Sequence, residues 1–493
     1  MSERVTLIGL DFGTTTSCAV VASARVACNS LTGRIELSDV RQEYQSGQIF
    51  TPLVDDRLDE AQLGRHLDAW LGQVDAAQIF GGGAVLTGLA AQKSNAAAFI
   101  RQTRQRLANA VIAVGEDPRL ESWLAFMGNC ADLSRANPDR MFINLDIGGG
   151  STNLAAGRHG EVLQTGSYFV GARHVQLAPG GYQITRLSPY ASTLFEHLGI
   201  AKTVGQRLDP QEVARIVDWY ARLLEDAVGG KLSTQLDAAS AMHEQVPFQL
   251  PPAVSDPALT LSGGVGQLVY GHLHGDPWPP TTAFGDLGVD LARGLAERPF
   301  WQRHLQAFVP TSLGHATVYG LLRYNTQASG STIYLSDPSL LPLSDLMILG
   351  TISPGSSAAD IERLIGLASQ AAGGACLRIE LPQRVLAEIR ELAARLRQAI
   401  ADQPLADQQP LVLLLRENLG KVLGQYLTDW GQLPWKVVVL DEIDQRDAQF
   451  AHLGALRQGV VPVSFYGASL GDKTNEPSAA AAGRDSGSRA KTG

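Results

Sequence analysis

Short apolar runs that end in glycine-rich turns occur three times along the chain. They cover residues 7–10, 141–145 and 259–261, and each is followed by glycine together with small hydroxyl residues. A run of this length, bounded by turn residues, is typical of a buried strand rather than of a helix. We therefore expect three buried strands whose carboxyl ends carry tight loops.

Other segments have the three- to four-residue apolar period of an amphipathic helix. Val213, Ile216 and Leu223 keep this period, and Asp209-Pro210 before them is a good helix start. The predicted helices cover residues 59–71, 210–226 and 382–401, and further buried strands are predicted over residues 84–86, 411–415 and 437–440.

The alternation of strand and helix signals indicates an α/β protein with more than one domain, because 493 residues are too many for a single hydrophobic core. The pattern divides the chain into residues 1–140, 141–336 and 337–470. Residues 471–493 contain glycine, serine, alanine and charge without an apolar period, so we expect a disordered tail there.

Composition narrows the class of protein. Hydrophobic residues make up 45% of the chain and charged residues 18%, as in soluble globular proteins. No window approaches the roughly eighteen apolar residues of a membrane span, and the N-terminus lacks the pattern of a signal peptide. A net charge of −9 argues against sequence-independent nucleic-acid binding. The four cysteines have neither metal-ligand spacing nor the density of a disulfide scaffold.

The first two turns carry the same chemistry. The first is I-G-L-D-F-G-T-T-T-S, residues 8–17, and the second is I-N-L-D-I-G-G-G-S-T-N-L-A, residues 143–155. Asp11 and Asp146 end their strands, where a carboxylate faces a cation such as Mg²⁺ directly or through water. The glycine N–H groups and hydroxyls that follow are donors for phosphate oxygens. These candidate phosphate-binding residues are Gly13, Thr14, Thr15, Thr16, Gly148, Gly149, Gly150, Ser151 and Thr152.

One such turn alone is best explained as an ordinary strand and glycine turn, but the ordered set is hard to obtain by chance. With L-T-L-S-G-G-V-G at residues 259–266 as the third member, the set resembles the actin-like ATPase superfamily of actin, sugar kinases and DnaK-type chaperones. The resemblance implies an α/β fold of two RNase H-like lobes around a nucleotide cleft, with a C-terminal α/β extension. It places Gly263, Gly264 and Gly266 against the nucleoside of ATP.

A closer resemblance, over nearly the whole chain, is to the ethanolamine ammonia-lyase reactivating factors (EutA family). Besides the ATPase motifs, it rests on segments that an ATPase does not require. These are A-T-V at 316–318, S-G-S-T-I-Y-L at 329–335, G-K-V-L-G at 420–424 and V-V-P-V-S at 460–464, and the family also has T-G at 87–88 and L-E-S at 120–122.

This resemblance implies an ATP-dependent chaperone that releases damaged cobalamin from adenosylcobalamin-dependent ethanolamine ammonia-lyase, so that intact cofactor can rebind. It implies slow Mg²⁺-dependent ATP hydrolysis in which Asp11 organises the metal and Asp146 orients the attacking water or the metal's hydration shell. The lyase is the expected partner and the cytoplasm the expected location. Association with a bacterial microcompartment and assembly into a homo-oligomer both stay open.

Two segments depart from the family pattern. Leu89 follows Thr87-Gly88 where the family often has glutamate, and G-L-L-R at residues 320–323 replaces a glycine-rich G-A-G. Both changes lie near expected nucleotide or lobe contacts.

Two other classes also use such loops. One is a small-molecule kinase of the same superfamily, and the other is an actin-like scaffold whose assembly depends on ATP. Two further clusters of residues can each be explained either by a function or by ordinary loop structure. His272 and His274 are either a metal pair or alternation on an exposed loop, and residues 441–444 (D-E-I-D) are either a cation or partner site or a solvated loop.

Overall fold

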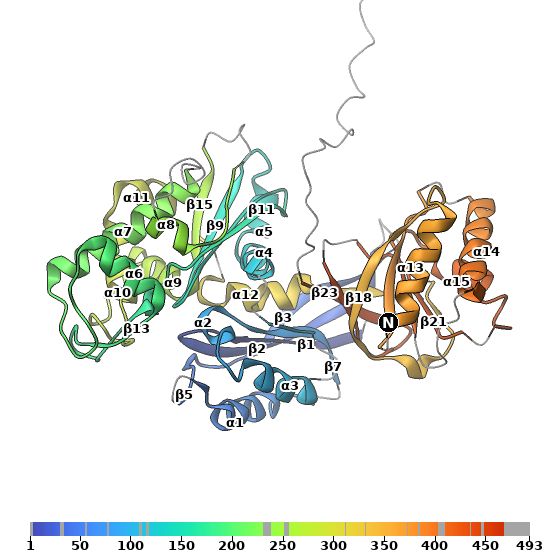
Figure 1. The fold of residues 1–493 in the computed structure, drawn as a ribbon, viewed down its shortest axis with the longest axis horizontal. Coiled ribbons are helices and arrows are strands. Elements are labelled where there is room, and N and C mark those ends of the chain that lie inside the picture. Colours follow the sequence, from blue (N-terminus) through green and yellow to red (C-terminus); the bar gives the residue numbers. More distant parts are fainter. Residues whose placement is uncertain are drawn as a thin grey trace, which may run out of the picture.

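The computed structural model describes residues 3–29, 34–54, 57–75, 78–107, 111–114, 118–229, 238–250, 256–310, 312–330, 332–371, 373–382, 385–402, 410–433, 435–444 and 448–467. Three large sheets organise this part of the chain (Figure 1). The predicted tail at residues 471–493 lies outside it. Among the described helices, none has the length and apolar character needed to cross a membrane.

The first sheet has the strand order β3-β2-β1-β7-β8. Its strands are β1 (Glu3–Phe12), β2 (Thr16–Cys28), β3 (Ile35–Gln45), β7 (Ile79–Leu86) and β8 (Val111–Val114). β1, β2 and β3 are antiparallel, whereas β7 lies parallel to β1 and β8 parallel to β7. Helices α1 (Glu60–Leu71) and α3 (Ala96–Arg106) cover one face, where Phe12 packs against Trp70 and Phe99. We call this sheet with α1 and α3 the first lobe.

The second sheet repeats this connectivity in the order β14-β11-β10-β9-β15. Its strands are β9 (Phe142–Ile147), β10 (Thr152–Arg158), β11 (Glu161–Tyr168), β14 (Glu244–Val246) and β15 (Ala258–Ser262). Again the first three strands form an antiparallel meander, and a later strand pairs in parallel with the first of them. This duplicated topology is that of two RNase H-like lobes, so the predicted fold class is confirmed.

Helices α7 (Pro210–Val228), α9 (Gly263–Leu273) and α10 (Gly288–Glu297) cover the second sheet and share one apolar core with it. The start of α7 is as expected, with Pro210 in the first turn. Asp209 accepts the N–H groups of Gln211 and Glu212, and the Glu212 carboxylate accepts the N–H of Asp209 in return. We call this sheet and its helices the second lobe.

Two crossing helices join the lobes. Helix α4 (Pro118–Asn129) packs on β10 and β11 of the second lobe, and helix α12 (Ala316–Gly320) packs on β1 of the first. Gly9 of β1 allows the close approach, because a Cβ there would lie 2.5 Å from Cγ1 of Val318. After α12 the chain continues as a π-helical turn, Leu321–Asn325, through the segment that departs from the family pattern.

The third sheet has the order β16-β23-β22-β18-β19-β20-β21-β17. Its strands are β16 (Thr326–Ser329), β17 (Tyr334–Leu335), β18 (Leu343–Ile352), β19 (Ala375–Ile379), β20 (Leu411–Leu415), β21 (Val437–Leu440), β22 (Phe450–Leu453) and β23 (Val461–Tyr466). Strands β18 to β21 are parallel. β16 and β17 follow one another in sequence yet form opposite edges, so the sheet curls until its edges approach each other.

Helices α13 (Ala358–Gln370), α14 (Leu386–Asp402) and α15 (Gly420–Leu427) cover one face of this sheet. Leu411, Leu413 and Leu415 pack under these helices, whereas Val412 and Leu414 fill the curled interior. The predicted strands 411–415 and 437–440 have the predicted bounds, but the helix expected over 382–401 is found at Leu386–Asp402. We call this sheet and its three helices the C-terminal unit.

The C-terminal unit is attached to the first lobe (Figure 1). Gly81 of β7 lies so close to Thr326 that a Cβ there would be 2.7 Å from its Cγ2, and the N–H of Gly82 donates to Thr326 Oγ1 at 2.9 Å. An ion pair of 2.6 Å between Arg104 and Asp345 adds to this contact.

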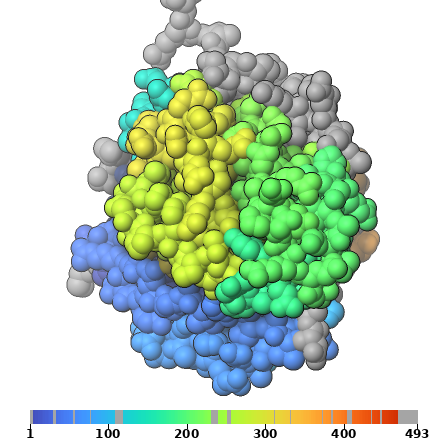
Figure 2. All heavy atoms as spheres, turned by 90° about the vertical axis from the view of Figure 1, so that its left-hand side faces the viewer, coloured from blue at the N-terminus to red at the C-terminus, as the bar shows by residue number. Residues whose placement is uncertain are grey.

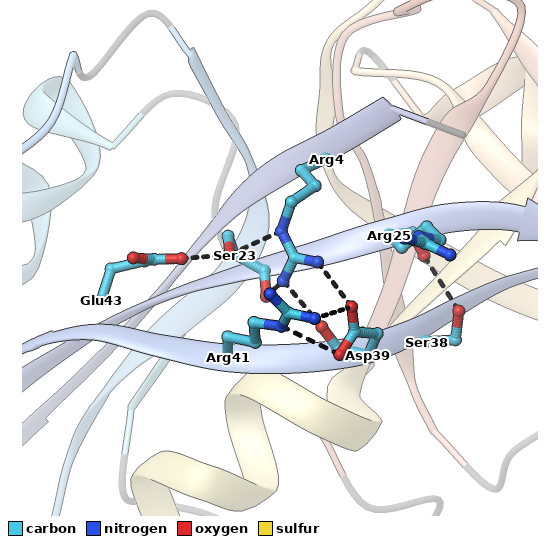
Figure 3. A network of polar contacts seen from close by, with 7 residues as sticks. All are labelled: Arg4, Ser23, Arg25, Ser38, Asp39, Arg41 and Glu43. Atoms are coloured by element: carbon cyan, nitrogen blue, oxygen red, sulfur yellow. Dashed lines mark hydrogen bonds and ion pairs between the residues drawn. The ribbon is translucent and has the colours of Figure 1, made fainter. Parts of the chain in front are cut away.

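Arg4 of β1 links strands β2 and β3 of the first lobe (Figure 3). Its guanidinium donates to the Ser23 hydroxyl at 2.9 Å and to the Asp39 carboxylate at 2.7 Å, and Arg41 donates to the same carboxylate at 3.0 Å. Asp39 has a φ of 48° where the pairing of β2 and β3 shifts register, so the network stabilises an irregular stretch of the hairpin.

The structure locates the two clusters for which the sequence left two explanations open. Asp441 is fully buried, and its Oδ2 accepts the N–H of Gly420 at 2.9 Å, so it caps α15 instead of lying in a solvated loop. His272 belongs to the last turn of α9, where it stacks on Trp278 with ring centroids 4.3 Å apart. In the described part of the chain, no group of three or more His, Cys, Asp or Glu side chains has metal-binding geometry.

Candidate functional site

A cavity of about 370 Å³ lies between the two lobes and is lined by all three glycine-rich turns. Figure 2 shows the second lobe, in green and yellow, lying on the first lobe, in blue. Twelve of the predicted site residues line the cavity: Asp11, Gly13, Thr14, Thr15, Thr16, Asp146, Gly148, Gly149, Gly150, Ser151, Gly263 and Gly264.

Thr152 and Gly266 are the two predicted site residues that do not line the cavity. Thr152 is buried on the opposite side of β10 from Ser151, and its hydroxyl donates to the carbonyl oxygen of Val170 at 2.8 Å. Gly266 faces inward from α9, where a Cβ would lie 3.0 Å from the carbonyl carbon of Leu261. Both residues support the loops from behind.

The first two loops have the same local geometry. In the first, the N–H of Gly13 donates to the carbonyl oxygen of Thr16 at 3.0 Å, and in the second the N–H of Gly148 donates to that of Ser151 at 2.9 Å. Each turn follows an aspartate by two residues. The duplicated fold therefore presents two equivalent turns to one cavity.

The two loops touch each other across the cleft. A Cβ on Gly149 would lie 2.1 Å from Thr15 Oγ1, and a Cβ on Gly150 would lie 3.0 Å from Thr14 Oγ1. The departure from the family pattern at Leu89 belongs to this contact, since its N–H donates to Thr14 Oγ1 at 2.8 Å. Glycine is needed at both positions because any side chain would separate the loops.

The two aspartates have raised pKa values. Burial raises the pKa of Asp11 to about 7, the charge of Asp146 adds to this, and a hydrogen bond from Thr87 opposes it. Burial likewise raises the pKa of Asp146 to about 6, although the Ser262 hydroxyl donates to it at 2.6 Å. Two carboxylates that destabilise one another in a buried cleft favour a cation between them.

The cavity suits a nucleotide with Mg²⁺. Thr15 Oγ1 is buried and has no hydrogen-bond partner in the described structure, which leaves a donor for a phosphate oxygen. Gly264 faces open space, with no atom within 4 Å of a Cβ there. Mg²⁺ needs few protein ligands because it keeps several waters, so Asp11 and Asp146 suffice.

Glu121 is a cavity residue that the sequence analysis did not assign a role. It lies in the first turn of α4 and is 5% exposed, and its carboxylate accepts a hydrogen bond of 2.7 Å from Asn153. Asn153 follows the second loop, and its own oxygen accepts from Ser167 at 2.8 Å. A further carboxylate of the cavity lining is thus held in place by a fixed amide.

Asp286 also lines the cavity and was not predicted. It is 2% exposed, and burial raises its pKa to about 6. Its Oδ1 accepts the N–H of Gly288 at 2.9 Å at the start of α10. Further side chains on this side of the cavity include Gln267, His272, Asp276 and Phe284.

Two RNase H-like lobes, each presenting an aspartate and a glycine turn to a shared cavity, define a protein of the actin-like ATPase fold. Within that class the chain belongs to the family of ethanolamine utilisation protein EutA, whose sequence profile matches residues 3–467.

Two curated relatives are named ethanolamine ammonia-lyase reactivase EutA, one from Escherichia coli K12 and one from Salmonella typhimurium LT2. Each is 30% identical to this chain over 489 residues. That alignment covers 94% of this chain and 98% of each relative. Among solved structures, the Aquifex aeolicus PPX-GPPA enzyme is 15% identical, with 55% of this chain and 72% of that chain covered and a TM-score of 0.32. A structural likeness this low has no bearing on function.

Proposed function

We propose that this protein is an ATP-dependent reactivating factor for adenosylcobalamin-dependent ethanolamine ammonia-lyase. It releases damaged or inactive cobalamin from the lyase so that intact adenosylcobalamin can rebind. The observation that carries the proposal is the cavity between the lobes, where both phosphate loops and two mutually destabilising carboxylates meet. Relatives named as reactivases, aligned over 94% of the chain, supply the client.

In this proposal each loop binds phosphate through its N–H groups and hydroxyls, and Gly263 and Gly264 lie against the nucleoside. Asp11 and Asp146 hold Mg²⁺ through its waters. ATP hydrolysis supplies free energy, and Mg²⁺ offsets the charge of the phosphates. Glu121 accepts a proton from, or orients, the attacking water, because its carboxylate lines the cavity and Asn153, directly after the second loop, fixes its position.

The lobes convert nucleotide state into movement. In the proposed cycle, the contact between Thr14 and Gly150 belongs to the closed cleft, and a nucleotide that bridges both loops favours that state. Loss of the terminal phosphate removes part of the bridge and shifts the population toward an open cleft. The lyase binds one of these arrangements preferentially, so its cofactor site is loosened during the cycle.

We further propose a cytoplasmic location, with association with a microcompartment as the alternative to free diffusion, and no role in binding nucleic acid or membranes. Assembly into a homo-oligomer is tested by light scattering with and without nucleotide. The proposed functional division into residues 1–140, 141–336 and 337–470 is tested by limited proteolysis.

The first experiment uses purified ethanolamine ammonia-lyase inactivated with cyanocobalamin. The full chain, Mg²⁺, ATP and adenosylcobalamin are added, and both regained activity and released cobalamin are followed. Recovery is expected with ATP, and not with ADP alone or with Asp11→Ala. If ATP is bound and hydrolysed but no cobalamin is released, the client assignment is wrong, and small-molecule kinase and filament assays come next.

A further inference from the structure

Arg173 lies directly behind the second phosphate loop. It belongs to a 3₁₀ turn, Ala172–His174, and its N–H donates to the carbonyl oxygen of Gly149 at 2.6 Å, while the N–H of Ala172 donates to that of Gly148 at 3.1 Å. The Arg173 Cβ would lie 3.4 Å from a Cβ on Gly149. The arginine is therefore in contact with the loop that faces the phosphates.

The guanidinium of Arg173 lacks the partners that a buried cation normally has. Its Nε and Nη1 are buried and have no hydrogen-bond acceptor in the described part of the chain. An arginine does not lose its charge in a protein, and buried donors without acceptors are costly. Burial lowers the pKa of Arg173, and only the nearby charge of Asp286 opposes this.

Asp286 attracts Arg173 without pairing with it. Its charge raises the pKa of Arg173, and the arginine in turn lowers that of Asp286, yet no ion pair within 4.0 Å joins these two described residues. One oxygen of Asp286 is already engaged by the N–H of Gly288. The carboxylate thus faces the cavity on one side and a partly satisfied guanidinium on the other.

A second unpaired donor belongs to another residue that contacts the same glycine. Thr15 Oγ1 of the first loop would be 2.1 Å from a Cβ on Gly149, and it too is buried without a hydrogen-bond partner in the described part of the chain. One residue from each lobe therefore contacts Gly149 and carries a buried donor that lacks an acceptor. A group rich in acceptors and negative charge, such as a terminal phosphate, supplies what is missing there.

We propose that Arg173 is a positioning residue that distinguishes a nucleoside triphosphate from a diphosphate. Its backbone N–H holds the turn at Gly149, and its guanidinium supplies positive charge behind that turn. Without a triphosphate the guanidinium is attracted to Asp286. When a triphosphate binds, it is attracted to the terminal phosphate instead. A diphosphate lacks the group that compensates this charge. The inference rests on the proposed nucleotide site and adds a residue that selects the nucleotide state.

The test measures the dissociation constants of the full chain for ADP and for the non-hydrolysable triphosphate AMPPNP by calorimetry, both with Mg²⁺. Arg173→Gln is expected to weaken AMPPNP binding about tenfold and ADP binding less than about threefold. Arg173→Lys keeps the charge without the planar fork and should fall between wild type and Arg173→Gln. Arg298→Gln is the matched control, because Arg298 is also half-buried in the second lobe but pairs with Glu225 and Asp218.

Asp286→Asn supplies a second, independent readout. Asparagine keeps an acceptor for the N–H of Gly288 but loses the charge that competes for Arg173, so AMPPNP binding should tighten. This gain should vanish in the Arg173→Gln background.

Three results overturn the inference. These are an unchanged ratio of the two constants in Arg173→Gln after an equal loss for both nucleotides, the same unchanged ratio with no loss for either, or the same gain from Asp286→Asn in either background. If wild type binds neither nucleotide, the proposed nucleotide site falls as well. If wild type binds both and the ratio does not depend on Arg173, the site stands and only the role of Arg173 is lost. Should Arg173→Gln fail to fold, Arg173→Lys and Asp286→Asn decide.

Discussion

Gly128 of α4 meets Ala316 of α12 so closely that a Cβ on the glycine would lie 1.9 Å from the carbonyl oxygen of Ala316. The contact is reciprocal, because a Cβ on Gly320 of α12 would lie 2.2 Å from the carbonyl oxygen of Leu124. Two helices therefore cross with backbone against backbone between the lobes. This crossing is where the relative orientation of the lobes is set.

Gly128→Ala should disturb that crossing. The methyl group meets a carbonyl oxygen that belongs to another helix, so the helices must separate, and we expect a loss of about 1–3 kcal/mol in the free energy of unfolding. Urea denaturation measures it. Gly47→Ala is the control, since Gly47 has open space around its Cα and an ordinary φ. Equal stability of the two variants would show that the crossing tolerates a side chain.

Gly149→Ala should abolish nucleotide binding while leaving a folded protein. The new methyl group occupies the place of Thr15 Oγ1 and forces the loops apart. In the double variant with Thr15→Ala the hydroxyl is gone, so cleft closure should return, but the phosphate donor is lost. Calorimetry with AMPPNP and small-angle scattering separate these effects. Tight binding by Gly149→Ala alone would contradict the closed arrangement of the loops.

Glu121→Gln should bind ATP normally but hydrolyse it slowly. The amide keeps the size of the side chain and loses its ability to accept a proton, so we expect a fall in turnover of about 100-fold. Glu161→Gln, an exposed position on β11, is the matched control. Phosphate release under saturating ATP gives the rate. A variant as fast as wild type would remove Glu121 from the proposed chemistry.

Without nucleotide, the contribution of Asp11 and Asp146 to the free energy of unfolding should fall as the pH rises. Burial, helped by the charge of Asp146, raises the pKa of Asp11 from 3.8 to about 7, and burial raises that of Asp146 to about 6. The folded state therefore holds these protons more tightly than the unfolded state. Its advantage is complete below about pH 4 and is lost as the pH approaches 7.

Asp11→Asn should remove the part of this decline that lies between pH 6 and 7, as measured by denaturation across the range. Mg²⁺ with nucleotide needs the ionised carboxylates, so the stabilisation that it gives should grow over the same range. A pH-independent effect of Mg²⁺–nucleotide on melting temperature would argue against these carboxylates as the metal site.

Much of the site could be predicted because local sequence dictates it. Both strands that end in aspartate and glycine form the same turn in this chain, and the duplicated topology then brings both turns to one cavity. Thr152 was assigned to the site by its place in the motif. Ser151, directly before β10, lines the cavity, whereas Thr152, the first residue of β10, is buried in the core.

Arg173 and Asp286 could not be predicted, because no local pattern marks them, and Glu121 lies in the L-E-S segment of the family resemblance without a local signal for its role. Each reaches the site through packing between elements that are distant in sequence. The division at residues 140 and 336 depends on tertiary contacts in the same way. Helix α4 packs on the second sheet although it precedes residue 140, and β16 joins the third sheet although it precedes residue 336.

Strand β7 has glycine at positions 81, 82 and 83, and it ends beside Thr87 and Gly88 of the nucleotide cavity. Thr326 of the C-terminal unit packs against these glycines. We therefore expect the C-terminal unit and the first lobe to move as one body. The second lobe and the C-terminal unit lie on opposite sides of the first lobe in Figure 1. Opening of the cleft therefore changes the distance between the second lobe and the C-terminal unit. If the proposed cycle opens and closes the cleft, a partner protein bound to both parts would be stretched or compressed with it.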